Sequence, residues 1–225
     1  MPSLRPILAQ AVIKALLSVL VLGVLIFLPA GTLQFFNGWL FLITLYALMS
    51  VTLIYLLRTN PDLLRKRLQL KERQTQQKSL MKFTAIFFLL AYTLPGFDYR
   101  FGWSHVPLWL VILAEIIMIL GYAMFVEVMR ENSYASRIIE IQEGQKLIET
   151  GLYGIIRHPM YAASLLIYLA SPFVLGSYYM AIPILLLPMI LVIRIQNEEK
   201  LLLKELPGYE AYRDKVRYRL IPGLW

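Results

Sequence analysis

The stretch PMYAASLLIYLASPFVLGSYYMAIPILLLPMILVI, residues 159–193, decides the fold of this chain because none of its 35 residues carries a charge. One transmembrane helix needs only about 20 apolar residues, so the run is too long for a single crossing. Pro172 and Gly176 mark a turn near its middle. Pro183 and Pro188 predict kinks in the returning helix. The run therefore predicts a helical hairpin that begins and ends on the same side of a membrane.

The composition of the whole chain is that of an integral membrane protein. Of its 225 residues, 59% are hydrophobic and 16% are charged, and the mean hydropathy is +0.63. Soluble domains carry about 25% charged residues, so a soluble fold is excluded. The chain has no cysteine, which excludes disulfides, thiolate catalysis and thiolate metal ligands. We expect no metal site.

Four further apolar segments precede the hairpin, and we interpret each as a membrane span. They are residues 11–29, 38–57, 83–97 and 107–129, the third extended backwards by Leu80 and Met81. More spans follow the first segment and it lacks a small-residue cleavage pattern, which favours a retained helix over a signal peptide. The prediction is an all-α integral membrane protein: four transmembrane helices, a C-terminal helical hairpin and a short C-terminal tail, forming a single membrane domain over residues 1–225.

Basic residues predict the orientation. Segment 58–82 holds eight lysines and arginines, which places it on the cytoplasmic side. The connections at 30–37 and 98–106 carry little charge and should face the other side. The parity of the spans then returns residues 130–158 and 194–225 to the cytoplasm. The net charge of +8 therefore reflects topology, and we expect no nucleic-acid partner.

Two polar motifs flank the hairpin. The arginine-histidine-proline triplet at 157–159 precedes it, and RIQNEE, residues 194–199, leaves it on the same side. The two motifs should therefore lie next to each other. Arg194 and Glu198 are four residues apart and share one helical face. One interpretation is an interfacial anchor plus an exposed ion pair; the sharper one is a site for a small zwitterionic ligand at the membrane surface.

These motifs resemble a known family. GLYGIIRHPMY (151–161), followed by RIQNEE and then by GYEAYRDKVRYRLIPGLW (208–225), is similar to the isoprenylcysteine carboxyl methyltransferases and the related phospholipid methyltransferases. The family signature is glycine, any residue, tyrosine, three residues, arginine-histidine-proline, one residue, tyrosine, and every fixed position is filled here. The resemblance is close over roughly the last 100 residues, and before them extends only to the presence of spans.

The resemblance implies S-adenosylmethionine-dependent methyl transfer at the membrane, without the nucleotide-binding α/β fold of soluble methyltransferases. In agreement, the chain contains no strand-turn-helix glycine fingerprint. The resemblance also implies a division into variable helices, residues 1–129, and a cofactor-binding catalytic core, residues 130–225. The active site is expected to face the cytoplasm.

Matching positions supply the expected site residues. For the cofactor they are Gln145, Lys146, Leu147, Ile148, Tyr153, His158, Pro159, Met160 and Tyr161, with Glu198 closing the site and Gln142 as a further candidate. Backbone groups of residues 145–148 would hold adenine and ribose. Arg194 matches the position that faces the methyl acceptor, so Arg194 and Glu198 are the expected catalytic residues.

Each of these residues also has a simpler interpretation. Tyr153 and Tyr161 are also typical of the aromatic belt at a membrane interface. Tyr209 and Tyr212 are expected to pack the tail onto the helices. Glu115 lies within the fourth span, where a carboxylate usually pairs or lines a cavity.

The acceptor is expected to be a lipophilic molecule that enters from the bilayer, with a carboxylate such as that of isoprenylcysteine favoured. A carboxylate or a thiolate needs no base, and a guanidinium such as that of Arg194 suits an anionic group. A phospholipid amine would need a base, for which the candidates are Glu198, Glu199 and Glu127. Alternatives outside this class are a nicotinamide-dependent membrane reductase and a non-enzymatic scaffold whose basic 58–82 segment binds lipid.

Overall fold

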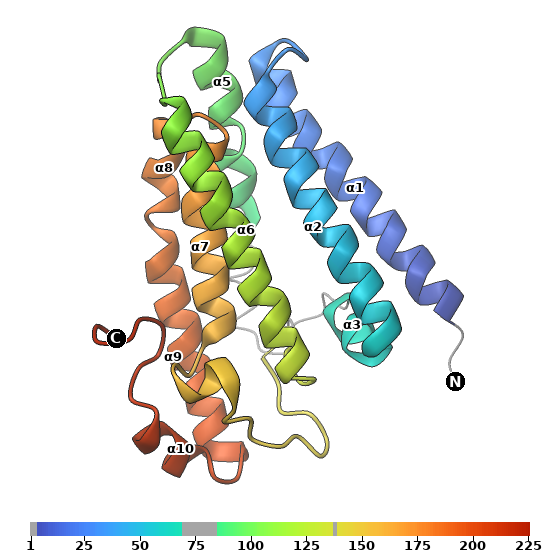
Figure 1. The fold of residues 1–225 in the computed structure, drawn as a ribbon, viewed down its shortest axis with the longest axis vertical. Helices are drawn as coiled ribbons and strands as arrows, with labels where there is room; N and C mark the ends of the chain where they lie inside the picture. Colours follow the sequence, from blue (N-terminus) through green and yellow to red (C-terminus); the bar gives the residue numbers. More distant parts are fainter. Residues whose placement is uncertain (1–3, 69–84, 137–138) are drawn as a thin grey trace.

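The computed structural model describes residues 4–68, 85–136 and 139–225, and every regular element in these ranges is helical (Figure 1). The elements are α1 (Leu4–Ala30), α2 (Phe36–Thr59), α3 (Pro61–Leu68), α5 (Leu94–Phe101), α6 (Leu108–Glu131), the 3₁₀ turn η1 (Gly151–Gly154), α7 (Pro159–Val174), α8 (Tyr178–Ile184), α9 (Leu187–Glu205) and α10 (Tyr209–Lys215). The predicted all-α class is confirmed.

Four stretches of the described chain are long and apolar enough to cross a membrane: α1, α2, α6, and the region Tyr178–Glu205 that contains α8 and α9. Helix α7 is apolar but shorter. The expected spans 11–29, 38–57 and 107–129 are confirmed as α1, α2 and α6. The chain is a multi-pass membrane protein.

The expected third span, 83–97, differs from the structure. Residues 85–91 are helical, but a turn follows and α5 then begins as a new helix. The break has a local cause: Pro95, at the start of α5, has no N–H to donate to the carbonyl of Ala91, and its ring would clash with that carbonyl. The first residues of this span, and its backward extension, lie outside the described residues.

Helix α5 packs against α1 at a point that only glycine allows. A Cβ on Gly96 would collide with the carbonyl oxygen of Ile26, on the backbone of α1. The missing side chain lets the two backbones approach closely. The second part of the expected third span is therefore fixed against the first helix.

The hairpin over residues 159–193 is confirmed. Helix α7 ends at a turn in which Gly176 has φ +71°, and α8 then runs back beside α7 (Figure 1). Residues 185 and 186 separate α8 from α9, between Pro183 and Pro188, as the predicted kinks required. Helix α6 packs along α7 and completes the core of the bundle.

The connections gather at two ends of the bundle. Helix α3, the loop after α6, α10 and the tail lie at the lower end in Figure 1, which we call the motif end. There Lys66 Nζ, on α3, donates to Gln142 Oε1 at 2.5 Å, and Lys215 Nζ lies 3.0 Å from Glu149 Oε2. The three segments predicted to share one side therefore do so over the described residues; residues 69–82 lie outside them.

Candidate active site

The arginine-histidine-proline motif meets α9 through the carboxylate of Glu199. Arg157 Nε donates to Glu199 Oε1 at 2.8 Å, and His158 Nε2 lies 3.3 Å from the same oxygen. Arg219 Nε, from the tail, donates to Glu199 Oε2 at 2.8 Å. The side chains of Arg157 and His158 are 4% exposed and that of Glu199 is 6% exposed. The two motifs meet as the hairpin predicted, but through Glu199 rather than through its neighbour Glu198.

Arg157 also fastens the C-terminal tail to the hairpin. Its Nη1 donates to the backbone carbonyls of Val216 and Arg217 at 2.7 and 2.8 Å. Its backbone N–H donates to the Tyr218 carbonyl, and the N–H of His158 donates to the Arg219 carbonyl, both at 2.9 Å. A charged arginine at this helix entrance is thus explained by its acceptors: one buried carboxylate and two tail carbonyls.

A second cluster lies beside the first and contains both residues expected to be catalytic. Arg194 Nε donates to Tyr161 Oη at 2.9 Å, and Tyr161 Oη donates to Glu198 Oε2 at 2.5 Å. Tyr161 therefore joins Arg194 and Glu198, and all three side chains are partly buried. The rings of His158 and Tyr161 are 5.7 Å apart, so the two clusters adjoin.

The expected adenine-binding stretch lies in the loop between α6 and η1. Its glutamines shape the loop: the Gln142 N–H donates to Gln145 Oε1, and Gln142 Nε2 donates to the Tyr134 carbonyl, both at 2.9 Å. The backbone of residues 146–148 makes no hydrogen bond to another described backbone group. Its peptide N–H and C=O groups are therefore not used in backbone pairing among the described residues.

Tyr153 links this loop to the tail. Its hydroxyl accepts a hydrogen bond from Asn132 Nδ2 at 2.8 Å, and its carbonyl accepts one from Tyr212 Oη at 2.7 Å. Burial raises the pKa of Tyr153 above its ordinary value, so its hydroxyl stays neutral near neutral pH. Pro159 is the first residue of α7, and Met160 packs against a buried cluster that includes Leu63 and Leu64 of α3.

The tail helix α10 packs onto the bundle through Tyr209 and Tyr212, as expected. Both lie in a buried cluster against which Leu147 also packs. The two hydroxyls differ. Tyr212 Oη donates to the Tyr153 carbonyl, whereas Tyr209 Oη is buried and has no hydrogen-bond partner among the described residues.

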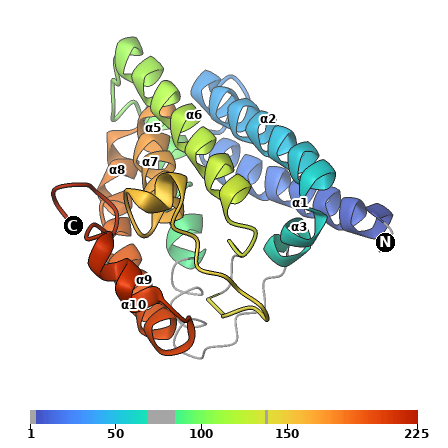
Figure 2. The same ribbon diagram turned by 60° about the horizontal axis from the view of Figure 1, so that its bottom comes forward.

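The groups of this region fit S-adenosylmethionine. Glu198 supplies an anionic oxygen for a cation, and the peptide groups of residues 146–148 supply donors and acceptors of the kind a purine edge requires. The buried hydroxyl of Tyr209 is a polar atom that lacks a partner within the protein. Figure 2 shows the loop after α6 and the tail around the end of α9, the arrangement that brings these groups together.

Two other glutamates lie in different surroundings. Glu127 is paired with Arg130 at 2.5 Å on the surface of α6. Glu115 Oε1 accepts a hydrogen bond from Thr44 across the contact between α6 and α2, and its Oε2 is buried with no partner among the described residues. Neither contacts the two motif clusters through any bond that the structure gives.

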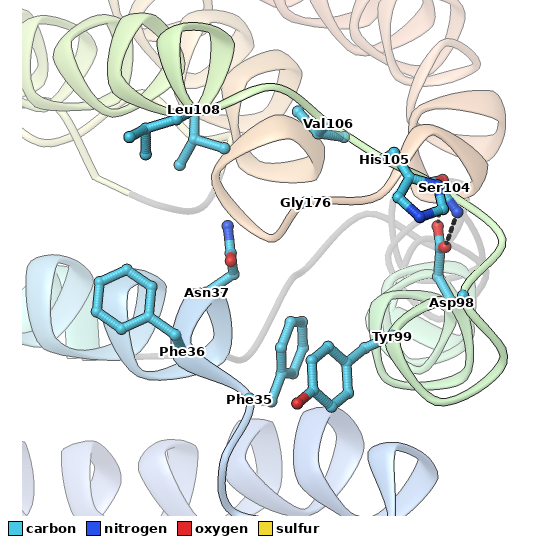
Figure 3. Close-up of a pocket in the computed structure, with 12 residues that line it drawn as sticks. Phe35, Phe36, Asn37, Asp98, Tyr99, Ser104, His105, Val106, Leu108 and Gly176 are labelled. Atoms are coloured by element: carbon cyan, nitrogen blue, oxygen red, sulfur yellow. Dashed lines mark hydrogen bonds between the residues drawn. The ribbon is translucent and has the colours of Figure 1, made fainter.

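The opposite end of the bundle carries a cavity of about 370 Å³ (Figure 3). His105 lies there on a loop and is exposed. Among the polar residues that line the cavity is Asp98, which is 1% exposed. It accepts hydrogen bonds from the Ser104 N–H and hydroxyl at 2.7 Å and from the Ser177 hydroxyl at 2.5 Å. The hydrogen bonds of Asp98 therefore link the α5–α6 loop to the α7–α8 turn, far from the motif end.

Comparison with known proteins agrees with the chemistry of the motif end. Residues 109–207 match the model of the family described as phospholipid methyltransferase. The match begins at the second residue of α6 and runs through the hairpin and α9, so it contains both motif clusters apart from Arg219. A search of the curated proteins gave no match.

This match supports a methyltransferase over the reductase and the scaffold. Isoprenylcysteine carboxyl methyltransferases are included among the members of this family. Residues 109–207 of the chain are therefore similar to the phospholipid methyltransferase family, whose members are membrane enzymes that use S-adenosylmethionine.

Proposed function

We propose that this enzyme methylates the carboxylate of a lipophilic acceptor, such as a prenylated carboxyl-terminal cysteine, at the cytoplasmic surface of a membrane. Its active site would be formed by the start of α7, the middle of α9, the 142–148 loop and the tail. The observation that carries the proposal is the chain Arg194–Tyr161–Glu198, in which a cation and an anion are held apart by one tyrosine.

The positions of Arg194 and Glu198 along α9 support separate roles for these two residues. Helix α9 runs from the apolar hairpin toward the motif end, so Arg194 lies about 6 Å nearer the apolar hairpin than Glu198 along the helix, at 1.5 Å per residue. In the proposed orientation, Arg194 is therefore the deeper of the two in the membrane. A partly buried guanidinium at that depth suits a carboxylate that enters from the lipid. Glu198, nearer the water, suits the cationic part of the cofactor.

Methyl transfer to a carboxylate needs little acid–base catalysis. When bound, S-adenosylmethionine supplies a methyl group already activated by its sulfonium. The protein must therefore align the acceptor and exclude water. A carboxylate acceptor is already deprotonated, so no base is needed. Both oxygens of Glu199 are occupied by Arg157, His158 and Arg219, so Glu199 holds the site together and does not abstract a proton.

The description of the matching family favours a second candidate acceptor, the amine of a phospholipid. This acceptor needs a base. Glu127 is bound to Arg130 on the surface of α6, and Glu199 is fully engaged. Glu198 is then the base among the three glutamates first considered. A small lipophilic thiol is a further acceptor that would need no base.

The proposal includes orientation and division of the chain. The basic residues of α3 and the tail lie together at the motif end, which supports a cytoplasmic location for that end. Residues 1–225 form one membrane domain in this proposal. Residues 1–129 shape the path of the acceptor and residues 130–225 hold the cofactor, although the family match extends back over α6. The bilayer and the lipophilic acceptor are the expected partners.

The test is an assay with methyl-labelled S-adenosylmethionine and purified protein in lipid. The acceptors are a farnesylcysteine derivative, phosphatidylethanolamine, a long-chain thiol and a native lipid extract. Mild alkali releases methanol from methyl esters but not from methylated amines or thiols. Alkali-labile label on the farnesylcysteine derivative is the expected result. Stable label on the lipid amine would select the second candidate, and no labelling of any acceptor would contradict the proposed activity.

A further inference from the structure

We propose that the hydroxyl of Tyr209 is a hydrogen-bonding group for S-adenosylmethionine, an inference that rests on the cofactor site proposed above. Tyr209 lies beyond residue 207, where the family match ends, so the match gives it no role. The sequence indicated only that it packs the tail.

The first reason is the state of its hydroxyl. Tyr209 is 3% exposed, and its Oη is buried without a hydrogen-bond partner among the described residues. Most buried polar atoms of native proteins are hydrogen-bonded, so such an atom calls for a partner that is not part of the chain. The ring is fixed by packing against Leu206, Val216 and Tyr212, the last at 5.7 Å between ring centroids.

The second reason is position. On one side, Arg157 of the first motif cluster donates to the carbonyl of Val216, and Val216 belongs to the same buried cluster as Tyr209. On its other side, Leu147 of the expected adenine-binding stretch packs against the same buried cluster as Tyr209. Tyr209 therefore lies between the two regions that the cofactor would have to bridge.

The third reason is chemical. Burial raises the pKa of Tyr209 far above its ordinary value, so the hydroxyl remains a neutral O–H donor under working conditions. The cofactor offers acceptors for it in both halves: the carboxylate of the methionine part, and the ribose and purine of the nucleoside part.

The test uses Tyr209→Phe, which removes one oxygen atom, and Tyr212→Phe as its matched control on the same helix. Calorimetry with S-adenosylhomocysteine, which cannot transfer a methyl group, measures affinity apart from activity. We expect Tyr209→Phe to weaken binding about 2- to 12-fold, the effect of one lost hydrogen bond. Its ligand-free melting temperature should stay equal to that of wild type or rise, because the lost oxygen has no partner in the protein.

The control should behave in the opposite way. Tyr212→Phe loses the hydrogen bond to the Tyr153 carbonyl, so its ligand-free melting temperature should fall, with a smaller change in affinity. A second ligand, methylthioadenosine, lacks the amino-acid half of the cofactor. Equal weakening of both ligands by Tyr209→Phe assigns the contact to the nucleoside half, and weakening of S-adenosylhomocysteine alone assigns it to the amino-acid half. Either result supports the inference.

Two results would overturn it. Unchanged affinity in Tyr209→Phe would remove the hydroxyl from the cofactor site. A lower ligand-free melting temperature with unchanged affinity would instead indicate that the hydroxyl binds a structural water. In both cases wild type still binds the ligand, so the proposed function stands. A wild-type protein that binds no S-adenosylhomocysteine would contradict the proposed function itself, and the inference with it.

Discussion

Arg157 and Glu199 form a buried ion pair, with Nε and Oε1 2.8 Å apart, that joins the entrance of α7 to α9. The pair closes the hairpin at its open end. Because Arg157 also binds two carbonyls of the tail, and Glu199 also binds Arg219, the same pair fixes the C-terminal segment against the site.

The first prediction is that Arg157→Ala strongly destabilises the protein. Removing one partner of a buried ion pair leaves the other charge uncompensated, at a cost of about 3–5 kcal/mol. Thermal unfolding of the purified protein in detergent measures the loss. The control is Arg130→Ala, which breaks the exposed pair with Glu127 and should leave the melting temperature unchanged. Equal melting temperatures for the two variants would contradict the role given to Arg157.

A second prediction separates the two ends of the Arg194–Tyr161–Glu198 chain. Glu198→Gln should mainly weaken cofactor affinity, by about 10- to 150-fold, because it removes the charged partner of a hydrogen bond. Arg194→Ala should mainly lower turnover and the use of the acceptor. Calorimetry and the methyl-transfer rate on the same preparations measure both.

The matched control for this pair is Glu205→Gln, at the exposed end of the same helix, which should change neither quantity. Equal losses of affinity and rate in both site variants would mean that the pair only shapes the pocket. Wild-type kinetics in both would exclude RIQNEE from the active site and leave only an ion pair at the surface.

The third prediction concerns topology. The chain has no cysteine, so single cysteines can be introduced without background. We expect cysteines at Glu143 and Gly223, both exposed at the motif end, to react with a membrane-impermeant reagent only from the cytoplasmic side. A cysteine at Gln34, in the exposed α1–α2 connection, should react only from the other side. Labelling of Glu143 and Gly223 positions from opposite sides would refute the hairpin topology.

The fourth prediction concerns the hydrogen bonds of Asp98 to Ser104 and Ser177, at the end of the bundle opposite the motif end. Asp98→Ala leaves one backbone N–H and two serine hydroxyls without their acceptor, which should destabilise the protein by about 2–3 kcal/mol. Cofactor affinity should not change, because Asp98 lies at the end of the bundle far from the proposed cofactor site. Melting temperature and calorimetry test the two halves of the statement, with His105→Ala as the exposed control. Lost cofactor binding in a folded Asp98→Ala protein would show that the two ends are coupled.

The sequence alone determined which segments form the long apolar helices and where the hairpin turns. A run of 35 uncharged residues with a proline and a glycine near its middle can only fold back within a bilayer, so the hairpin followed from length and turn chemistry. The hairpin in turn required residues 157–159 and 194–199 to meet. The apolar segments likewise predicted α1, α2 and α6, because hydropathy is a property of composition and needs no partner.

Only the tertiary structure decided which side chains meet. Glu198 and Glu199 are adjacent, but successive residues on a helix point about 100° apart, so one faces Tyr161 and the other faces Arg157. Sequence similarity favoured Glu198, and the buried position of Glu199 became visible only when α7, α9 and the tail were packed together. In the sequence, Glu199 is marked only as one of two adjacent glutamates in RIQNEE, and nothing local shows which of the two is buried.

The same difference between local signals and tertiary packing explains why the third expected span is broken and why the hydroxyl of Tyr209 has no partner among the described residues. Pro95 is a local signal for a break that the hydropathy of residues 83–97 does not reveal, and the backbone contact of Gly96 with α1 depends on a helix distant in sequence. Tyr209 carries the same tail-packing pattern as Tyr212, yet the hydroxyl of Tyr212 reaches a carbonyl and that of Tyr209 reaches none. The sequence determined where the chain crosses and turns, because apolar length and turn residues act locally. The partner of each polar group was decided by packing, because it depends on the relative rotation of helices far apart in the chain.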